Sequence, residues 1–218
     1  PGYWILLQAI KCIYLALRRN THFIVQRRAK LWGIDFGITH PFAAVLIVAL
    51  ASAAAIGEVV HYNILEGLTK INVDGSISPL LAESWKMDAD GKAFTFKLRK
   101  GVKFSDGSAF DAEAVKFSFE RAKAEKSTNK AKGAVFNNIS HISTPDAHTV
   151  VLVLNNPDGN FLFRMGENTA VILDPKSAAG TATKPVGTGP FTFDDWKKGS
   201  SVTLARWPGF RDAKAVKL

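Results

Sequence analysis

The stretch from residue 85 to residue 98 alternates apolar and polar side chains around a tight-turn dipeptide, and no other feature constrains the fold as strongly. Asp90-Gly91 is a strong hairpin signal, because glycine readily adopts the backbone angles that a two-residue turn requires. In the second strand, 93–98, the apolar residues share one face and the polar residues share the other. One face of the hairpin is therefore expected to be buried, and we predict four core residues here: Trp85, Phe94, Phe96 and Phe104.

The rest of the chain after residue 60 also indicates short strands, turns and helices. Asp111 is placed to cap a helix in which Val115, Phe119 and Ala122 recur at helical spacing. Further predicted elements are strands 139–142 and 148–154 around a turn at Pro145-Asp146, a short helix 161–165, and a last hairpin of strands 191–196 and 202–206 that turns at Lys198-Gly199.

The net charge of +9 is distributed unevenly along the chain. Residues 1–40 contain six Lys and Arg against one acidic residue, which leaves 22 basic against 18 acidic residues in 41–218. The later part therefore has a mixed surface without a basic track, and we expect no nucleic-acid partner. The single Cys12 excludes a disulfide within the chain.

The chain changes character near residue 50. Residues 3–17 are almost all apolar and precede a basic stretch, and a second apolar run, 41–56, carries no charge. This run is shorter than the roughly 20 residues that span a bilayer comfortably. Three interpretations remain for residues 1–51: an export signal or membrane anchor, a stretch foreign to the following domain, or a buried helix. Membrane contact through residues 3–56 is one consequence to consider.

The patterns that carry enzyme chemistry are missing from the sequence. The five histidines, at positions 22, 40, 61, 141 and 148, show no zinc-ligand spacing, and no nucleophile has an identifiable base. Gly187-Thr188-Gly189-Pro190 lacks the ending and context of a phosphate loop, so we interpret it as a tight turn in which glycine supplies unusual backbone angles. We expect no enzyme, no metal site and no cofactor.

Three blocks of sequence resemble the family 5 extracellular solute-binding proteins, which include dipeptide, oligopeptide, glutathione and nickel receptors of ABC importers. The first block is Asn63 to Leu68 followed by Pro79 to Trp85. The second, most specific block runs from Asp90 to Gly107 and on from Asp111 to Ser118. The third is Pro185 to Phe191 with Trp196, Gly199 and Arg206 to Phe210. The resemblance covers residues 52–218.

The resemblance implies an α/β fold: a periplasmic-binding-protein-like lobe with a mixed sheet and β-hairpins, here preceded by a helical apolar amino-terminal segment. It implies a receptor without catalysis that captures peptides of the di- and oligopeptide class and delivers them to an ABC permease and ATPase complex. The implied location is the periplasm or the outer face of the cytoplasmic membrane. Peptide is favoured over nickel because the sequence shows no metal-ligand cluster.

The resemblance also implies the ligand-binding residues. Ser52, Ala53 and Ala54 match a ligand-side loop of the family, and Phe136, Glu167 and Asn168 occupy regions where relatives touch ligand. Each of the last three has a simpler interpretation, because Phe136 fits a core position and Glu167 and Asn168 fit a surface turn.

Two departures from the family pattern support a second hypothesis, a truncated remnant of such a receptor without transport function. Family members are much longer, with a second lobe expected after Leu218, and residues 34–50 do not contain the first strand of the family. We predict that residues 1–50 do not pack as that strand, because their apolar runs have helical rather than alternating character. Without the second lobe, we expect millimolar or weaker binding of peptides.

Overall fold

The computed structural model describes residues 30–31, 34–35, 60–197 and 201–212. The chain divides into two compact units, residues 1–42 with 216–218, and residues 43–215. In the first unit, β1 (Lys30–Leu31) and β2 (Ile34–Asp35) form a two-stranded antiparallel sheet. The other residues of the predicted amino-terminal segment, including most of the 3–56 region considered for membrane contact, lie outside the described part of the chain.

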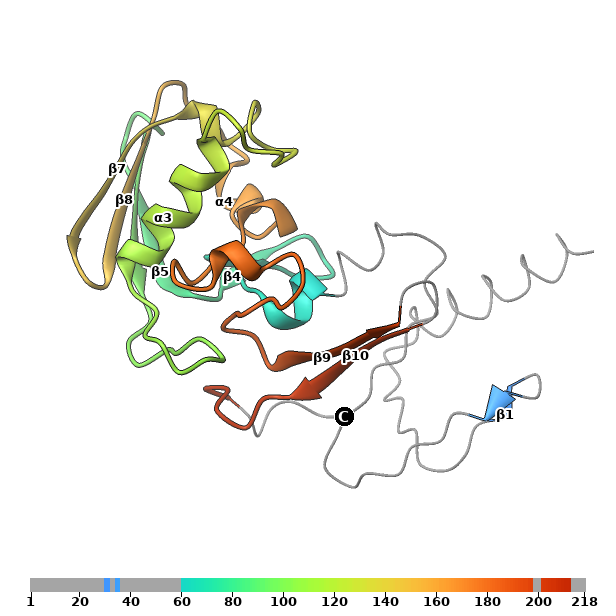
Figure 1. Cartoon of the computed structure of the whole chain (residues 1–218). Coiled ribbons are helices and arrows are strands. Elements are labelled where there is room, and N and C mark those ends of the chain that lie inside the picture. Colours follow the sequence, from blue (N-terminus) through green and yellow to red (C-terminus); the bar gives the residue numbers. More distant parts are fainter. Residues whose placement is uncertain (1–29, 32–33, 36–59, 198–200, 213–218) are drawn as a thin grey trace, which may run out of the picture. The chain divides into compact units, whose positions relative to one another are not determined.

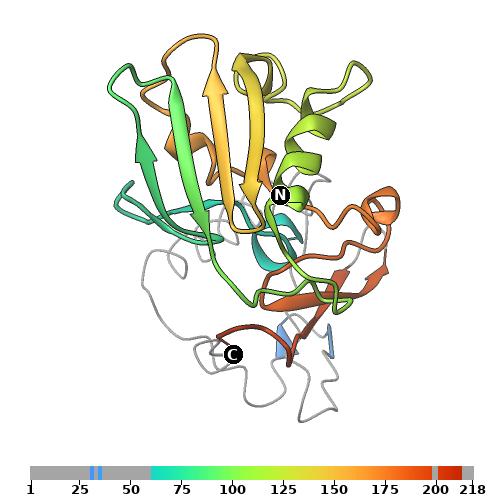
Figure 2. The same cartoon turned by 90° about the vertical axis from the view of Figure 1, so that its left-hand side faces the viewer.

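A four-stranded sheet forms the centre of the second unit, in the order β5-β6-β8-β7 (Figure 2). Its strands are β5 (Ala82–Met87), β6 (Ala93–Leu98), β7 (Ile139–Asp146) and β8 (Thr149–Leu154). Helices cover one face, so the α/β class and the β-hairpins are confirmed (Figure 1). All strand pairs in the described residues are antiparallel, whereas a mixed sheet was expected. The reason is that two hairpins, β5-β6 and β7-β8, join through β6 and β8.

The first predicted hairpin is confirmed in detail. Gly91 adopts a φ of 66°, and the Asp88 Oδ1 atom accepts hydrogen bonds from the backbone N–H groups of residues 92 and 93. Phe94, Phe96 and Leu98 are buried on one face of β6. Trp85, opposite Phe96, is partly buried and packs against the same cluster. Alternation of side chains thus directs this strand's apolar face into the core.

Helix α3 (Ala112–Lys123) lies against the same face of the sheet as the short α4 (Phe161–Arg164) (Figure 1). Asp111 is the N-cap, and its carboxylate accepts a hydrogen bond from the Ala114 N–H at 3.0 Å. The predicted residues Val115, Phe119 and Ala122 form the buried stripe. The ring of Phe161 in α4 packs against that of Phe94, with centroids 4.7 Å apart and planes inclined by 42°. The helices therefore close one core together with the sheet.

The turn between β7 and β8 lies two residues later than predicted. It consists of Ala147 and His148, while Pro145 and Asp146 belong to β7. Proline is tolerated there because β7 is an edge strand, where a missing N–H need not disrupt a ladder. The carboxylate of Asp146 forms the turn instead, accepting from the His148 N–H and the Thr149 hydroxyl, each at 2.8 Å.

Two further hairpins complete the unit. β3 (Thr69–Ile71) pairs with β4 (Ile77–Pro79), and β9 (Phe191–Lys197) pairs with β10 (Ser201–Arg206), as the sequence predicted for the latter. Single 3₁₀ turns are η1 (Phe136–Asn138), η2 (Asn168–Ala170) and η3 (Ala178–Gly180).

A second apolar cluster contains Ile64, Leu65, Leu173, Ala178, Val202 and Leu204. Within the described ranges, no helix has the length and apolar character needed to traverse a membrane.

Candidate functional site

A hollow of about 1240 Å³ lies between the β3-β4 hairpin, the ends of β5 and β6, and the segment that follows β10. Helical residues 61 and 62, Gly166 and Glu167, and residues 210–212 also line it. All of these residues belong to the second unit. The hollow is large enough for a small ligand and is the candidate site.

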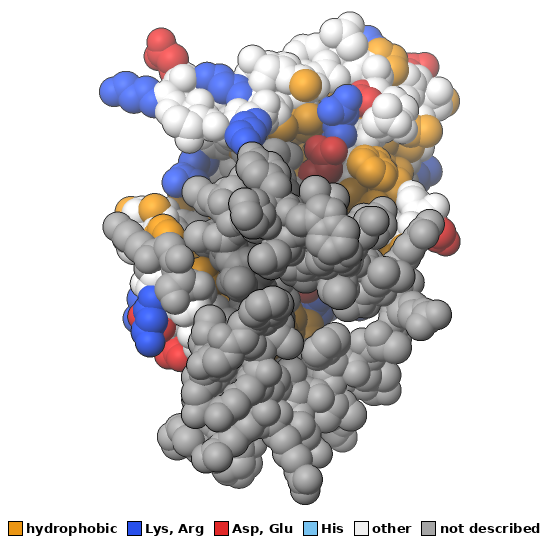
Figure 3. Space-filling model, turned by 90° about the vertical axis from the view of Figure 1, so that its right-hand side faces the viewer, with side chains coloured by type: hydrophobic (Ala, Val, Ile, Leu, Met, Phe, Trp, Pro, Cys, Tyr) orange, Lys and Arg blue, Asp and Glu red, His pale blue; other side chains and the backbone are white. Residues whose placement is uncertain are grey.

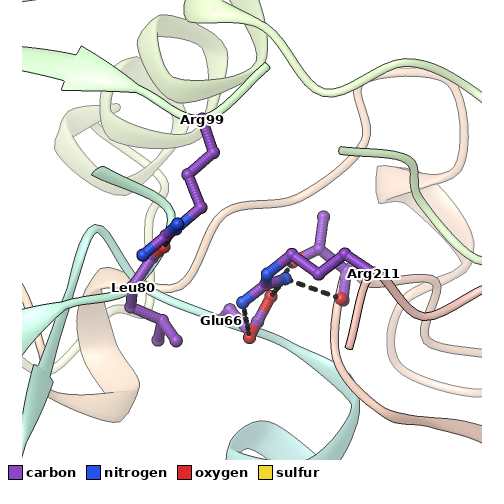
Figure 4. A network of polar contacts seen from close by, with 5 residues as sticks. Glu66, Leu80, Arg99 and Arg211 are labelled. Carbon is purple, nitrogen blue, oxygen red and sulfur yellow. Dashed lines mark hydrogen bonds and ion pairs between the residues drawn. The ribbon is translucent and has the colours of Figure 1, made fainter. Parts of the chain in front are cut away.

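The wall of the hollow contains a partly buried ion pair between residues far apart in the sequence (Figure 4). Arg211 Nη1 donates to Glu66 Oε2 at 2.6 Å, and Nη2 donates to Oε1 at 2.7 Å. The Thr188 hydroxyl donates to Glu66 Oε2 at 2.8 Å. The Glu66 side chain is 8% exposed and that of Arg211 is 23% exposed. Such bidentate pairing satisfies the carboxylate almost completely.

Arg211 is further held by its neighbour. Its guanidinium lies over the Phe210 ring, 4.9 Å from the centroid, and its Nη1 also approaches the Thr188 carbonyl at 3.4 Å. Arg211 and Thr188 line a second, smaller cavity of about 590 Å³ as well. The ion pair therefore forms part of the partition between the two cavities and ties the segment after β10 to the segment before β3.

Close backbone contacts place Glu66 in this wall. A Cβ atom on Gly67 would lie 2.5 Å from the Met165 carbonyl oxygen, so only glycine permits this approach. A Cβ atom on Gly187 or on Gly189 would likewise overlap the Ile64 carbonyl group, and the Gly189 N–H donates to the Ile64 carbonyl oxygen at 2.9 Å. The turn expected at 187–190 thus needs glycine for close packing. The expectation that these glycines supply unusual backbone angles was wrong, because neither Gly187 nor Gly189 is among the glycines with positive φ.

A second arginine of the hollow is fixed differently. Arg99 follows β6 directly, and its Nε donates to the Leu80 carbonyl at 2.5 Å (Figure 4). Its backbone N–H donates to the Leu81 carbonyl at 2.9 Å. The side chain lines the hollow together with Lys70 and Lys100. The guanidinium is therefore held in position by a neutral carbonyl rather than by an acid.

Acidic and basic side chains line the hollow in equal number. The basic ones are Lys70, Arg99, Lys100 and Arg211, and the acidic ones are Glu66, Glu83, Glu167 and Asp212. On the face drawn in Figure 3, the side chains of the described residues that are visible include both Lys or Arg and Asp or Glu. Such a site suits a ligand that carries both signs of charge, and it offers no continuous track for phosphates.

His61, at the edge of the hollow, differs from the other groups there. Burial lowers its pKa below the usual value of 6.5, because the charged imidazolium loses hydration. It is therefore neutral at pH 7. In the part of the chain that the structure describes, no group of three His, Cys, Asp or Glu is placed to hold a metal ion.

The structure separates the six residues proposed from the sequence. Ser52, Ala53 and Ala54 lie outside the described residues. Glu167 lines the hollow, and Asn168 begins the 3₁₀ turn η2 next to it. Phe136 is fully buried and packs on Phe119 with ring centroids 5.5 Å apart, which is the core position named as its simpler interpretation. Their role in ligand binding stays a prediction.

Sequence reasoning did not single out Glu66, Arg99 or Arg211. Glu66 carried a usable signal, because it stands between apolar residues that are buried, and a buried carboxylate requires a partner. Arg211 is 145 residues away, and no local pattern links the two. Arg99 looked like one more water-facing cation in an alternating strand.

Comparison with known proteins gives a consistent result. The family model described as "Bacterial extracellular solute-binding proteins, family 5 Middle" matches residues 76–218. A glutathione-binding protein, GsiB, of Pectobacterium atrosepticum is 31% identical over 168 residues, which cover 75% of this chain and 32% of that protein. The dipeptide-binding protein of Escherichia coli K12 is 34% identical over 163 residues, 63% of this chain and 30% of the relative.

A solved structure shows the same fold. The periplasmic binding protein DppA of Helicobacter pylori, in complex with the peptide STSA, is 28% identical and superposes with a TM-score of 0.64. The match covers 78% of this chain and 38% of that one. The chain thus spans about a third of the length of the curated relatives it matches.

Proposed function

Because the chain belongs to the family 5 bacterial extracellular solute-binding proteins, we propose that it serves in capturing peptides of the di- and oligopeptide class for an ABC importer. In this role it binds its ligand without chemical change. Its partners are then the membrane permease and ATPase of the importer, and its location is the periplasm or the outer face of the cytoplasmic membrane.

The observation that carries the proposal is the match of residues 76–218 to the family, together with a hollow lined by both signs of charge. A peptide with free ends carries an amine and a carboxylate, so it requires opposite charges at separate places. The relatives named above are a glutathione-binding and a dipeptide-binding protein, and both named ligands are short peptides. These names favour peptide over other cargo for this chain.

Peptide binding is measured on the 218-residue chain by following backbone amide signals in nuclear magnetic resonance spectra. Dipeptides and tripeptides with free ends are added, and a neutral disaccharide of similar size is the control. We expect saturable shifts at residues of the hollow, such as Tyr62, Thr69 and Gly166, with peptide and not with sugar. Spectra in which no peptide moves these signals saturably would contradict the proposal.

A further inference from the structure

Arg99 is held in position at one guanidinium nitrogen, and its two terminal nitrogens remain able to donate hydrogen bonds. Its Nε is bonded to the Leu80 carbonyl, and among the described residues no hydrogen bond or ion pair engages its Nη1 and Nη2 atoms. The side chain is half-buried and lines the hollow. The guanidinium of this lining residue therefore keeps two terminal nitrogens that have no acceptor among the described residues.

The support of this side chain is rigid. Leu80 and Leu81 lead into β5, Arg99 follows β6, and these two strands pair with each other. Leu81 is fully buried, and the backbone N–H of Arg99 bonds to its carbonyl. The backbone N–H and the Nε atom of Arg99 are thus both bonded to the segment that leads into β5. A guanidinium held in this way loses little rotamer entropy when it binds an anion.

Arg99 has no direct ion-pair partner among the described residues. Glu66, a carboxylate lining the same hollow, is already occupied by Arg211 and Thr188. Glu83, Glu167 and Asp212 line the hollow beside Lys70 and Lys100, but no acidic oxygen of the described residues lies within 4.0 Å of the Arg99 nitrogens. A direct contact with the guanidinium is therefore available to an anionic group of a ligand.

We propose that Nη1 and Nη2 of Arg99 bind a carboxylate of the ligand through two parallel hydrogen bonds. The planar fork matches the two oxygens of a carboxylate. This assignment rests on the proposed function and gives it a chemical requirement: the ligand carries a free carboxylate, as the carboxyl end of a peptide does. Arg211, with its own acid, takes no part in this contact.

The test compares a dipeptide with its amide. Ala-Phe and Ala-Phe-amide are titrated into the wild-type chain and into Arg99→Gln, in which the side-chain amide retains a donor for Leu80. Arg121→Gln is the matched control. Arg121 is exposed on α3 and lines neither cavity, and the substitution removes the same charge as Arg99→Gln. We expect the wild type and the control to bind the amide about 10- to 100-fold more weakly than the acid. Arg99→Gln should bind the acid as weakly as the amide.

Acetate separates this inference from the peptide function. In the wild-type chain, acetate should shift the Arg99 Nε–H signal saturably and leave the Arg121 signal unchanged. If peptides do not bind but acetate gives this response, the peptide assignment fails and the carboxylate site stands. If acid and amide bind wild type equally, if Arg99→Gln still distinguishes them, or if acetate gives no saturable shift at Arg99, the inference is overturned. The peptide assignment is then decided by the peptide titrations alone.

Discussion

Removing Arg211 from its pair with Glu66 should destabilise the fold substantially, which is measurable in the variant Arg211→Ala. The substitution removes two charge-assisted hydrogen bonds of 2.6 and 2.7 Å and leaves the Glu66 carboxylate, 8% exposed, with Thr188 as its hydrogen-bonding partner. Removing one partner of a fully buried pair costs about 3–5 kcal/mol. Because Arg211 is 23% exposed, we expect about 2–4 kcal/mol here.

Urea unfolding measures this loss. With a slope of about 1–3 kcal/mol per molar urea, the midpoint should fall by about 1–2 M and the slope should not change. The variant Glu66→Gln and the double variant complete a cycle. Because the double variant has no buried unpaired charge, it should be more stable than the sum of the two losses predicts, by about 1–3 kcal/mol.

A variant on the exposed face of α3 is the control for these stability measurements. Arg121→Ala, on the exposed face of α3, should change stability by less than about 0.5 kcal/mol. A loss below about 1 kcal/mol in Arg211→Ala would show that the pair is hydrated in solution. Additive losses in the cycle would show that Glu66 and Arg211 stabilise the fold independently, and either result would refute the reasoning.

Three further variants test the fold. Phe96→Ala should cost about 3–5 kcal/mol in urea unfolding, because Phe96 is fully buried, and a loss below about 1 kcal/mol would place that face in solvent. Gly187→Ala should reduce the thermal midpoint sharply, since its Cβ would overlap the Ile64 carbonyl; an unchanged midpoint would refute the close approach. Hydrogen bonds from Thr149 and the backbone hold the pKa of Asp146 below 3.8, so Asp146→Asn should be less stable than wild type at pH 7. That difference should vanish as pH falls through the lowered pKa, and a pH-independent difference would contradict it.

The sequence predicted those elements whose signals are local. The β5-β6 hairpin follows from alternation around Asp90-Gly91, and α3 follows from the cap Asp111 with apolar residues at helical spacing. The β7-β8 turn was misplaced because Pro145 normally marks a turn, yet an edge strand accepts it. Whether a strand lies at an edge depends on the pairing of all strands in the sheet, and the nearby residues do not indicate it.

The candidate site was much less predictable. Its wall depends on Glu66 and Arg211, which only the fold brings together, and on Gly187, whose need is set by the distant backbone of Ile64. Glu167 was proposed from the family resemblance, and it lines the hollow; its role in ligand binding stays a prediction. A local sequence pattern cannot indicate a partner that is 145 residues away, and it cannot indicate that a distant segment of backbone packs against a glycine.

Arg99 and Arg211 show why residue type alone does not identify a binding group. Both arginines follow a strand closely and line the same hollow. Arg211 meets a carboxylate, so its charge is used in holding the wall together. Arg99 meets a carbonyl, which accepts one hydrogen bond but carries no charge to neutralise the guanidinium. Of the two arginines, Arg99 is therefore the one whose charge stays available to a ligand, and only the identity of each arginine's partner in the folded chain distinguishes it from Arg211.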